Sequence, residues 1–91
     1  MNQFPHFNRF SAVFHQDMAI VYSSFESAIE TGLNYIGPGA HAPLLQEVEK
    51  LLLLTHAEMQ DVWSKTSAEI VFFKATELEK FLEMVRDRLR A

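Results

Sequence analysis

The 91-residue chain contains no cysteine. This absence excludes disulfide bonds, a thiolate nucleophile, a thiol redox motif and any zinc site with cysteine ligands. Glycine and proline are scarce, with three residues of each type, and no glycine-rich loop of the kind that binds phosphate groups is present. Without disulfides the fold has to rest on a hydrophobic core, for which 48% of the residues are suited, eight phenylalanines among them.

Long apolar segments are also missing. The runs LLLL at 51–54 and IVFF at 70–73 are far shorter than the ~20 residues of a membrane-spanning helix. The first ten residues, MNQFPHFNRF, contain no basic leader followed by an unbroken apolar stretch, which is the pattern of a signal peptide. We therefore expect a soluble, cytoplasmic protein with no membrane partner.

Basic residues are absent from a long part of the chain. The formal net charge is −4, and no lysine or arginine lies between Arg9 and Lys50. An acidic surface repels the phosphate backbone, which argues against nucleic-acid binding, and it attracts basic protein partners. A solvated acidic face with no special role is the alternative. The base-free part contains five carboxylates: Asp17, Glu26, Glu30, Glu47 and Glu49.

Apolar residues recur at helical spacing along most of the chain. This periodicity predicts an all-α fold, with about five short helices in a single compact bundle over residues 1–91. Phe7, Phe10 and Phe14 mark one face of a first helix, which opens with Pro5 and ends near the segment 15–17. Similar stripes predict further helices over about 23–36, over 43–54, from 55 onward and over about 76–90. At 69–73, β-branched and aromatic residues leave a short extended segment as an alternative to helix.

Three helix starts are indicated by a Ser or Thr followed three residues later by Glu, the pattern of a capping box. The pairs are Ser23 with Glu26, Thr55 with Glu58, and Thr76 with Glu79. In the helix over 43–54, the leucine stripe is expected to face the core, and Glu47 and Glu49 are expected to face outward.

Side chains that carry catalysis or bind metals form no recognisable pattern. The histidines at 6, 15, 41 and 56 include no i, i+4 pair and no HExxH motif, so no metal site is predicted. No GxSxG motif is present, and carboxylates two residues apart on a helix do not face each other. The sequence thus predicts no catalytic residue, no cofactor and no enzymatic activity. Trp63 and the phenylalanines are expected in the core.

A family resemblance covers most of the chain, and one segment carries its specific motif. FPHFNRFSAVFHQDM, residues 4–18, resembles the N-terminal signature of the CdiI-type immunity proteins of bacterial contact-dependent growth inhibition systems. The match centres on Phe14, His15, Gln16 and Asp17, the Phe-His-Gln-Asp core of that signature. Val13 stands where the family has an aromatic residue, and Met18 stands where it has tryptophan.

The resemblance implies a function in binding. Immunity proteins of this kind neutralise a cognate toxin C-terminal domain, commonly a nuclease, inside the cytoplasm. A nuclease that grips phosphates is basic, which fits an acidic partner. We therefore expect a basic toxin domain as the partner, and a monomer in preference to a homo-oligomer. From charge alone, the predicted contact residues are Asp17, Glu26, Glu30 and Glu47.

Two alternatives stay open at this point. In the first, the Phe-His-Gln-Asp segment is structural: Phe14 enters the core, His15 and Gln16 bind main-chain groups, and Asp17 caps a turn; otherwise Asp17 faces the toxin. In the second, the whole chain is a helical adaptor or oligomerisation domain without a toxin partner, because the run 70–73 would mark an interface if it were exposed.

Overall fold

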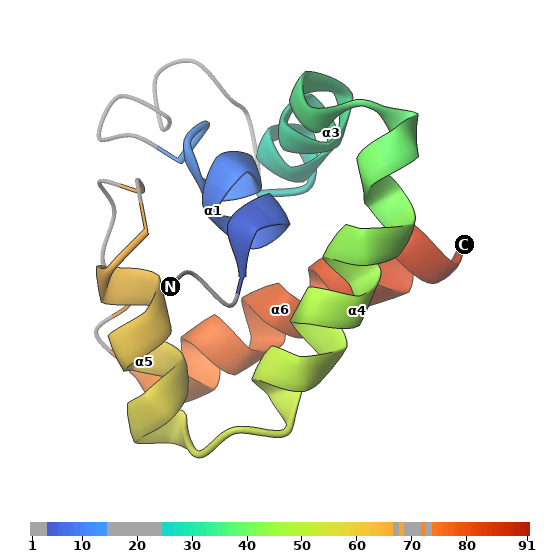
Figure 1. The fold of residues 1–91 in the computed structure, drawn as a ribbon. Helices are drawn as coiled ribbons and strands as arrows, with labels where there is room; N and C mark the ends of the chain where they lie inside the picture. Colours follow the sequence, from blue (N-terminus) through green and yellow to red (C-terminus); the bar gives the residue numbers. More distant parts are fainter. Residues whose placement is uncertain (1–3, 15–24, 67, 69–71, 73) are drawn as a thin grey trace.

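All regular secondary structure in the described part of the chain is helical (Figure 1). A computed structural model of the protein describes residues 4–14, 25–66, 68, 72 and 74–91. The all-α prediction is confirmed; of the segment 69–73, whose extended alternative was left open, only residue 72 is described. In chain order the elements are α1 (Pro5–Ser11), α3 (Phe25–Ile36), the 3₁₀ turn η1 (Pro38–Ala40), α4 (His41–Leu52), α5 (His56–Ser64) and α6 (Ala75–Arg90).

The long C-terminal helix organises the arrangement. Helix α6 packs most extensively on α4 and α5, whereas α1 packs on α3 and α4. Figure 1 shows α1 near the centre of the molecule, with α6 running beneath it and α4 crossing α6. The Cα radius of gyration is 12.0 Å, which matches the value of about 12 Å expected for a compact chain of this length. Helices α4 and α5 therefore share α6 as their support.

Aromatic side chains from four parts of the chain fill the core. Phe14 lies edge-on to Phe81 with ring centroids 5.1 Å apart, and Trp63 lies 5.5 Å from the same ring. Such edge-to-face pairs add to the stabilisation from burial. The core placement predicted for Phe14 and Trp63 is confirmed. This aromatic cluster consists of Phe7, Phe10, Phe14, Trp63, Phe72 and Phe81.

Helices α1 and α3 approach closely because α3 has a glycine at the contact. A Cβ atom on Gly32 would lie 2.6 Å from Cε1 of Phe10 and 3.3 Å from Cγ2 of Val13. The ring of Phe10 is fully buried, so it has no free space into which it could withdraw. The missing side chain at Gly32 therefore allows this helix pair to pack.

Helix α4 begins earlier than its sequence pattern suggested. It starts at His41 rather than Pro43 and ends at Leu52 rather than Leu54. Pro43 is accommodated because the first turn of a helix leaves its N–H groups unpaired in any case. Gly37, with a φ of 83°, ends α3 as predicted and leads into η1.

The capping patterns had different outcomes. The box at Thr55 and Glu58 is confirmed: each side chain accepts from the other residue's backbone N–H, and these bonds lower the pKa of the Glu58 carboxyl. The box at Thr76 is wrong, because Lys74 in extended conformation is the N-cap and Thr76 already lies inside α6. Glu79 instead pairs with His56 at 3.1 Å. Ser23, the expected partner of Glu26, lies outside the described residues.

Candidate functional site

The carboxylate of Glu47 is buried, so the prediction that it faces outward is wrong. The residue is 8% exposed. Its Oε1 accepts from the Phe7 N–H at 2.9 Å, and its Oε2 lies 2.5 Å from His6 Nδ1. Glu47 therefore caps the start of α1, where backbone N–H groups lack partners and a negative charge is favoured. We remove it from the set of candidate partner contacts.

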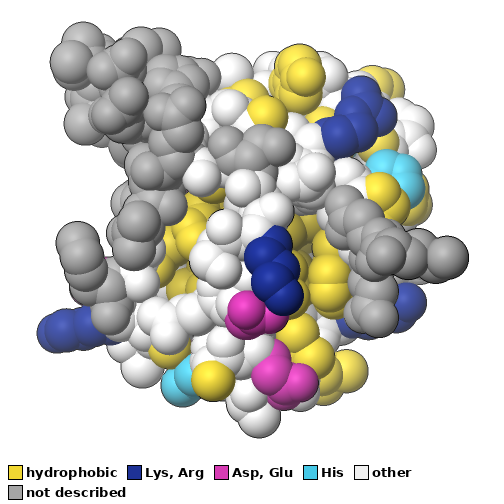
Figure 2. Space-filling view, turned by 60° about the vertical axis from the view of Figure 1, so that its left-hand side comes forward, with side chains coloured by type: hydrophobic (Ala, Val, Ile, Leu, Met, Phe, Trp, Pro, Cys, Tyr) yellow, Lys and Arg dark blue, Asp and Glu magenta, His cyan; other side chains and the backbone are white. Residues whose placement is uncertain are grey.

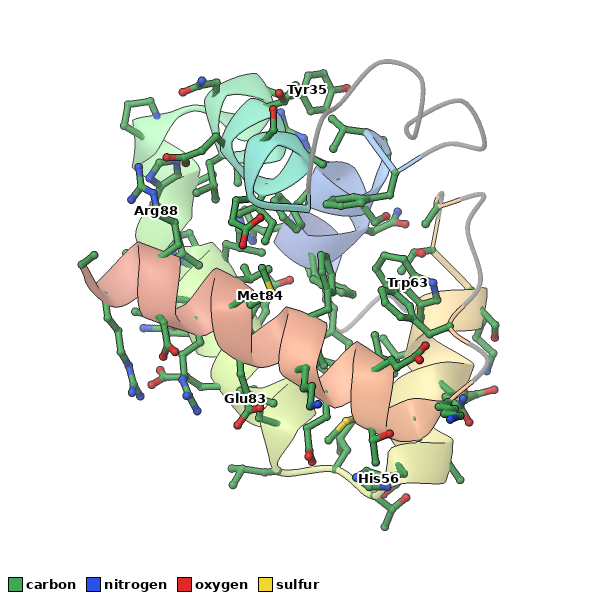
Figure 3. The ribbon with its side chains drawn as sticks, turned by 180° about the vertical axis from the view of Figure 1, so that it is seen from behind. Tyr35, His56, Trp63, Glu83, Met84 and Arg88 are labelled. Atoms are coloured by element: carbon green, nitrogen blue, oxygen red, sulfur yellow. The ribbon has the colours of Figure 1, made fainter. Side chains whose placement is uncertain are left out.

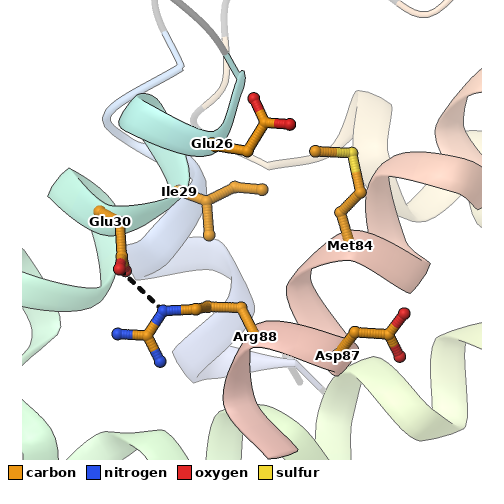
Figure 4. A pocket seen from close by; sticks show the side chains of 6 residues that line it. All are labelled: Glu26, Ile29, Glu30, Met84, Asp87 and Arg88. Carbon is orange, nitrogen blue, oxygen red and sulfur yellow. Dashed lines mark hydrogen bonds and ion pairs between the residues drawn. The ribbon is translucent and has the colours of Figure 1, made fainter. Parts of the chain in front are cut away.

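The other two described candidates, Glu26 and Glu30, lie one turn apart on the exposed side of α3. They border a groove of about 310 Å³ between α3 and α6 (Figure 4). The structure thus brings both residues together at one feature of the surface. The lining consists of Glu26, Ile29, Glu30, Met84, Asp87 and Arg88.

An ion pair closes one end of this α3–α6 groove. Arg88 Nε donates to Glu30 Oε1 at 2.7 Å, and both side chains are about half exposed. Asp87, on the α6 side, accepts from its neighbour Arg86 at 3.0 Å. Glu26 has no hydrogen bond or ion pair among the described residues. The groove therefore holds three carboxylates and one guanidinium, and Glu26 is the carboxylate left for a partner.

The C-terminal arginines were interpreted from the sequence only as complements of the helix dipole. In the structure Arg88 pairs with Glu30 of α3, and Arg90 pairs with Glu49 of α4. These partners are 58 and 41 residues away in the sequence. Arginines of the C-terminal helix thus neutralise part of the negative charge in the middle of the chain. The sequence did not reveal these pairs because their residues lie far apart along the chain.

A second hollow, of about 360 Å³, lies beside α5, on the side of the molecule that Figure 2 turns forward. Its acidic groups are engaged within the protein: Glu58 belongs to the capping box, and Asp61 pairs with Lys65 at 3.0 Å. Hydrophobic side chains also show between polar ones on the face seen in Figure 2. The lining consists of Phe4, Leu54, Ala57, Glu58, Asp61 and Val62.

The remaining predicted site residues have no described position. His15, Gln16 and Asp17 lie outside the described residues, while Phe14, the first residue of that motif, is fully buried. Within the described ranges, no group of three or more His, Cys, Asp or Glu side chains is placed to hold a metal ion. None of the helices described there has the length and apolar character needed to cross a membrane.

Comparison with protein families supplies the decisive observation. The family model of the CdiI immunity protein matches residues 3–89, nearly the whole chain. The chain belongs to the CdiI immunity protein family. The resemblance to this family, whose specific motif lies at residues 4–18, is thereby confirmed. Searches of curated proteins and of solved structures found no significant match.

In this CdiI-family protein, the structure separates two acidic residues that cap helices from two that stand at the groove. Glu47 and Glu58 cap helices of the protein itself. Glu26 and Glu30 stand at the α3–α6 groove, and both walls of that groove lie within the matched residues 3–89. The groove accordingly combines exposed negative charge with apolar surface.

Proposed function

We propose that this CdiI-family protein binds and neutralises the cognate toxin domain of a contact-dependent growth inhibition system. The observation that carries the proposal is the family match over residues 3–89. We further propose that the toxin domain is basic, as a nuclease would be, and that the two proteins meet in the cytoplasm. The protein acts in this proposal as a binding partner and not as an enzyme.

The charge of the protein supports a basic partner. The formal net charge is −4, and complementary charge raises the rate at which two proteins find each other. Exposed carboxylates are available for this on α3, whereas that of Glu47 is buried. Asp17 stays a proposed contact, as an alternative to its structural role in the Phe-His-Gln-Asp segment.

A protection experiment tests the proposal. The cognate toxin C-terminal domain, sought first in the gene immediately upstream, is expressed in a susceptible bacterium with and without the protein. We expect growth to stop with the toxin alone and to be restored by co-expression, because the immunity protein occupies the toxin. A toxin domain from an unrelated system is the control and should not be neutralised. Growth arrest despite soluble protein, together with no binding of the purified pair, would contradict the proposal.

The alternative, a helical adaptor or oligomerisation domain, rested on the apolar run 70–73. Of this run only Phe72 is described, and its ring packs 5.2 Å from Trp63 and 5.4 Å from Phe81. Phe72 therefore contributes to the aromatic cluster of the core. We retain the toxin-binding function as the better supported of the two.

A further inference from the structure

We propose that the α3–α6 groove is an anchor site that receives one arginine side chain of the toxin. The inference rests on the proposed function, because it assumes a toxin partner, and it deepens that function by assigning the surface and the chemistry of the contact. The arginine stem would lie on Ile29 and Met84, and its guanidinium would meet the carboxylate of Glu26.

Each wall of the groove consists of three residues on one face of a single helix. Glu26, Ile29 and Glu30 stand at positions i, i+3 and i+4 of α3, so they share one face of that helix. On α6, Met84, Asp87 and Arg88 have the same spacing. Figure 3 shows Met84 and Arg88 directed from α6 toward α3, while Glu83 lies on another side of the helix. The two triplets thus face each other across the groove (Figure 4).

The floor is apolar and the rim is charged. Ile29 is almost fully buried at 2% exposure, and Met84 is half-buried beside it. Methionine is flexible and adapts its shape to an incoming group. A side chain that enters here has to offer an apolar stem and a polar end, which is the composition of arginine and lysine.

The size of the groove favours a single side chain. At about 310 Å³ it lies at the lower limit of small-molecule sites, which span roughly 300–1,000 Å³. Protein interfaces draw most of their affinity from a few such anchors, among which arginine is enriched. The groove thus has the size to hold one anchor side chain of a larger interface.

The charge of the lining selects a cation. Glu26, Glu30 and Asp87 stand against Arg88, which leaves the lining with a net charge of −2; Arg86, bound to Asp87, reduces this to −1. Arg88 already pairs with Glu30, so a second guanidinium would meet Glu26, which has no hydrogen bond or ion pair among the described residues. Arginine suits the site better than lysine because its planar fork binds a carboxylate through two parallel hydrogen bonds.

Two variants with the same change in charge provide the test. Glu26→Gln removes a carboxylate from the groove, and Glu83→Gln removes one from another side of α6, outside the groove lining. Both raise the net charge by one, so long-range attraction to a basic toxin falls equally in both. Binding to the cognate toxin domain, identified by the protection experiment, is measured by surface plasmon resonance, and folding is checked by thermal unfolding.

We expect Glu26→Gln to raise the dissociation constant about tenfold or more, mainly through faster dissociation, because it removes the partner of a desolvated cation. Glu83→Gln should change it by less than about twofold. Met84→Lys, which also adds one positive charge, should weaken binding at least as much as Glu26→Gln. Single arginine replacements in the toxin should reveal one residue whose effect is not additive with Glu26→Gln.

The outcomes separate the anchor site from the function. If the wild-type protein binds the toxin and the two glutamine variants weaken binding equally, the anchor proposal is overturned and the proposed function stands. It is equally overturned if the variants alter self-association in light scattering and leave toxin binding unchanged, since a second copy would then fill the groove. If the wild-type protein does not bind the toxin, both proposals fall.

Discussion

At the scale of single residues, Glu47 links two helices that are distant in the sequence. Its carboxylate reaches from the middle of α4 to the first turn of α1, where it accepts from the Phe7 N–H and contacts His6. Removing a buried acceptor from a backbone donor lowers the stability of the fold by more than the hydrogen bond itself contributes, because the buried donor is then left without a partner. The role of Glu47 is therefore to hold α1 in place.

This role predicts a specific loss of stability. Glu47→Ala should lower the free energy of unfolding by about 1–3 kcal/mol, the cost of leaving a buried donor unpaired. Glu47→Gln should cost less, because its amide oxygen can still accept from Phe7. The control is Glu49→Ala, which removes an exposed pair with Arg90 and should cost less than about 1 kcal/mol. Urea unfolding measures all three. Equal losses for Glu47→Ala and Glu49→Ala would mean that the cap does not stabilise α1.

At the scale of the elements, the contact between α1 and α3 depends on the space left by Gly32. Alanine is the better helix former by about 1 kcal/mol, so propensity alone would make Gly32→Ala stabilising. A Cβ at that position lies 2.6 Å from the buried ring of Phe10, and overpacking a core costs about 1–3 kcal/mol. Packing should therefore outweigh propensity.

We expect Gly32→Ala to destabilise the protein by up to about 2 kcal/mol, the overpacking cost less the gain in propensity. Gly39→Ala is the matched control, because nothing lies within 4 Å of a Cβ added there; it should change stability by no more than about 0.5 kcal/mol. Thermal unfolding compares the two. A more stable Gly32→Ala protein would show that α1 and α3 are free to move apart.

Among the features of the helices, the buried faces could be predicted from the sequence, whereas the capping boxes could be predicted only in part. The core stripes of α3 to α6 were predicted because burial repeats with the helical period, and Leu44, Val48, Leu51 and Val85 are indeed buried. The two capping patterns at Thr55 and Thr76 read alike, yet only the first forms a box. The difference arises from where the preceding chain turns extended, at Thr55 itself in one case and at Lys74 in the other. That position is not encoded in the four-residue pattern.

At the scale of the whole molecule, the sequence could indicate the fold and the family but not which acids remain at the surface. Carboxylates in the base-free part look equivalent in sequence. The fold makes Glu47 a buried cap, pairs Glu30 and Glu49 with α6, and leaves Glu26 exposed. Each of these assignments except that of Glu26 depends on a contact across 40, 41 or 58 residues. Long-range pairing of this kind follows from packing and is not visible in local periodicity.

The surface of the whole molecule also predicts its state in solution. The large hydrophobic side chains exposed among the described residues are Tyr35 at 60% and Leu53 at 87%. They lie near the end of α3 and just after α4. Two separate side chains offer far less than the roughly 800 Å² per partner that a stable interface buries, and a net charge of −4 opposes self-association. We therefore predict a monomer.

Light scattering coupled to size-exclusion chromatography measures this directly. Over a tenfold range of concentration the molar mass should stay at 10.5 kDa, because neither the net charge nor the apolar surface exposed among the described residues favours a second copy. Leu53→Ser is the matched variant, and it should leave the mass unchanged. A mass twice as large would contradict the prediction. It would favour the alternative function, an oligomerisation domain, over a monomeric immunity protein. If Leu53→Ser then restored the monomer, the interface would lie at the end of α4, and the α3–α6 groove would remain available to the toxin.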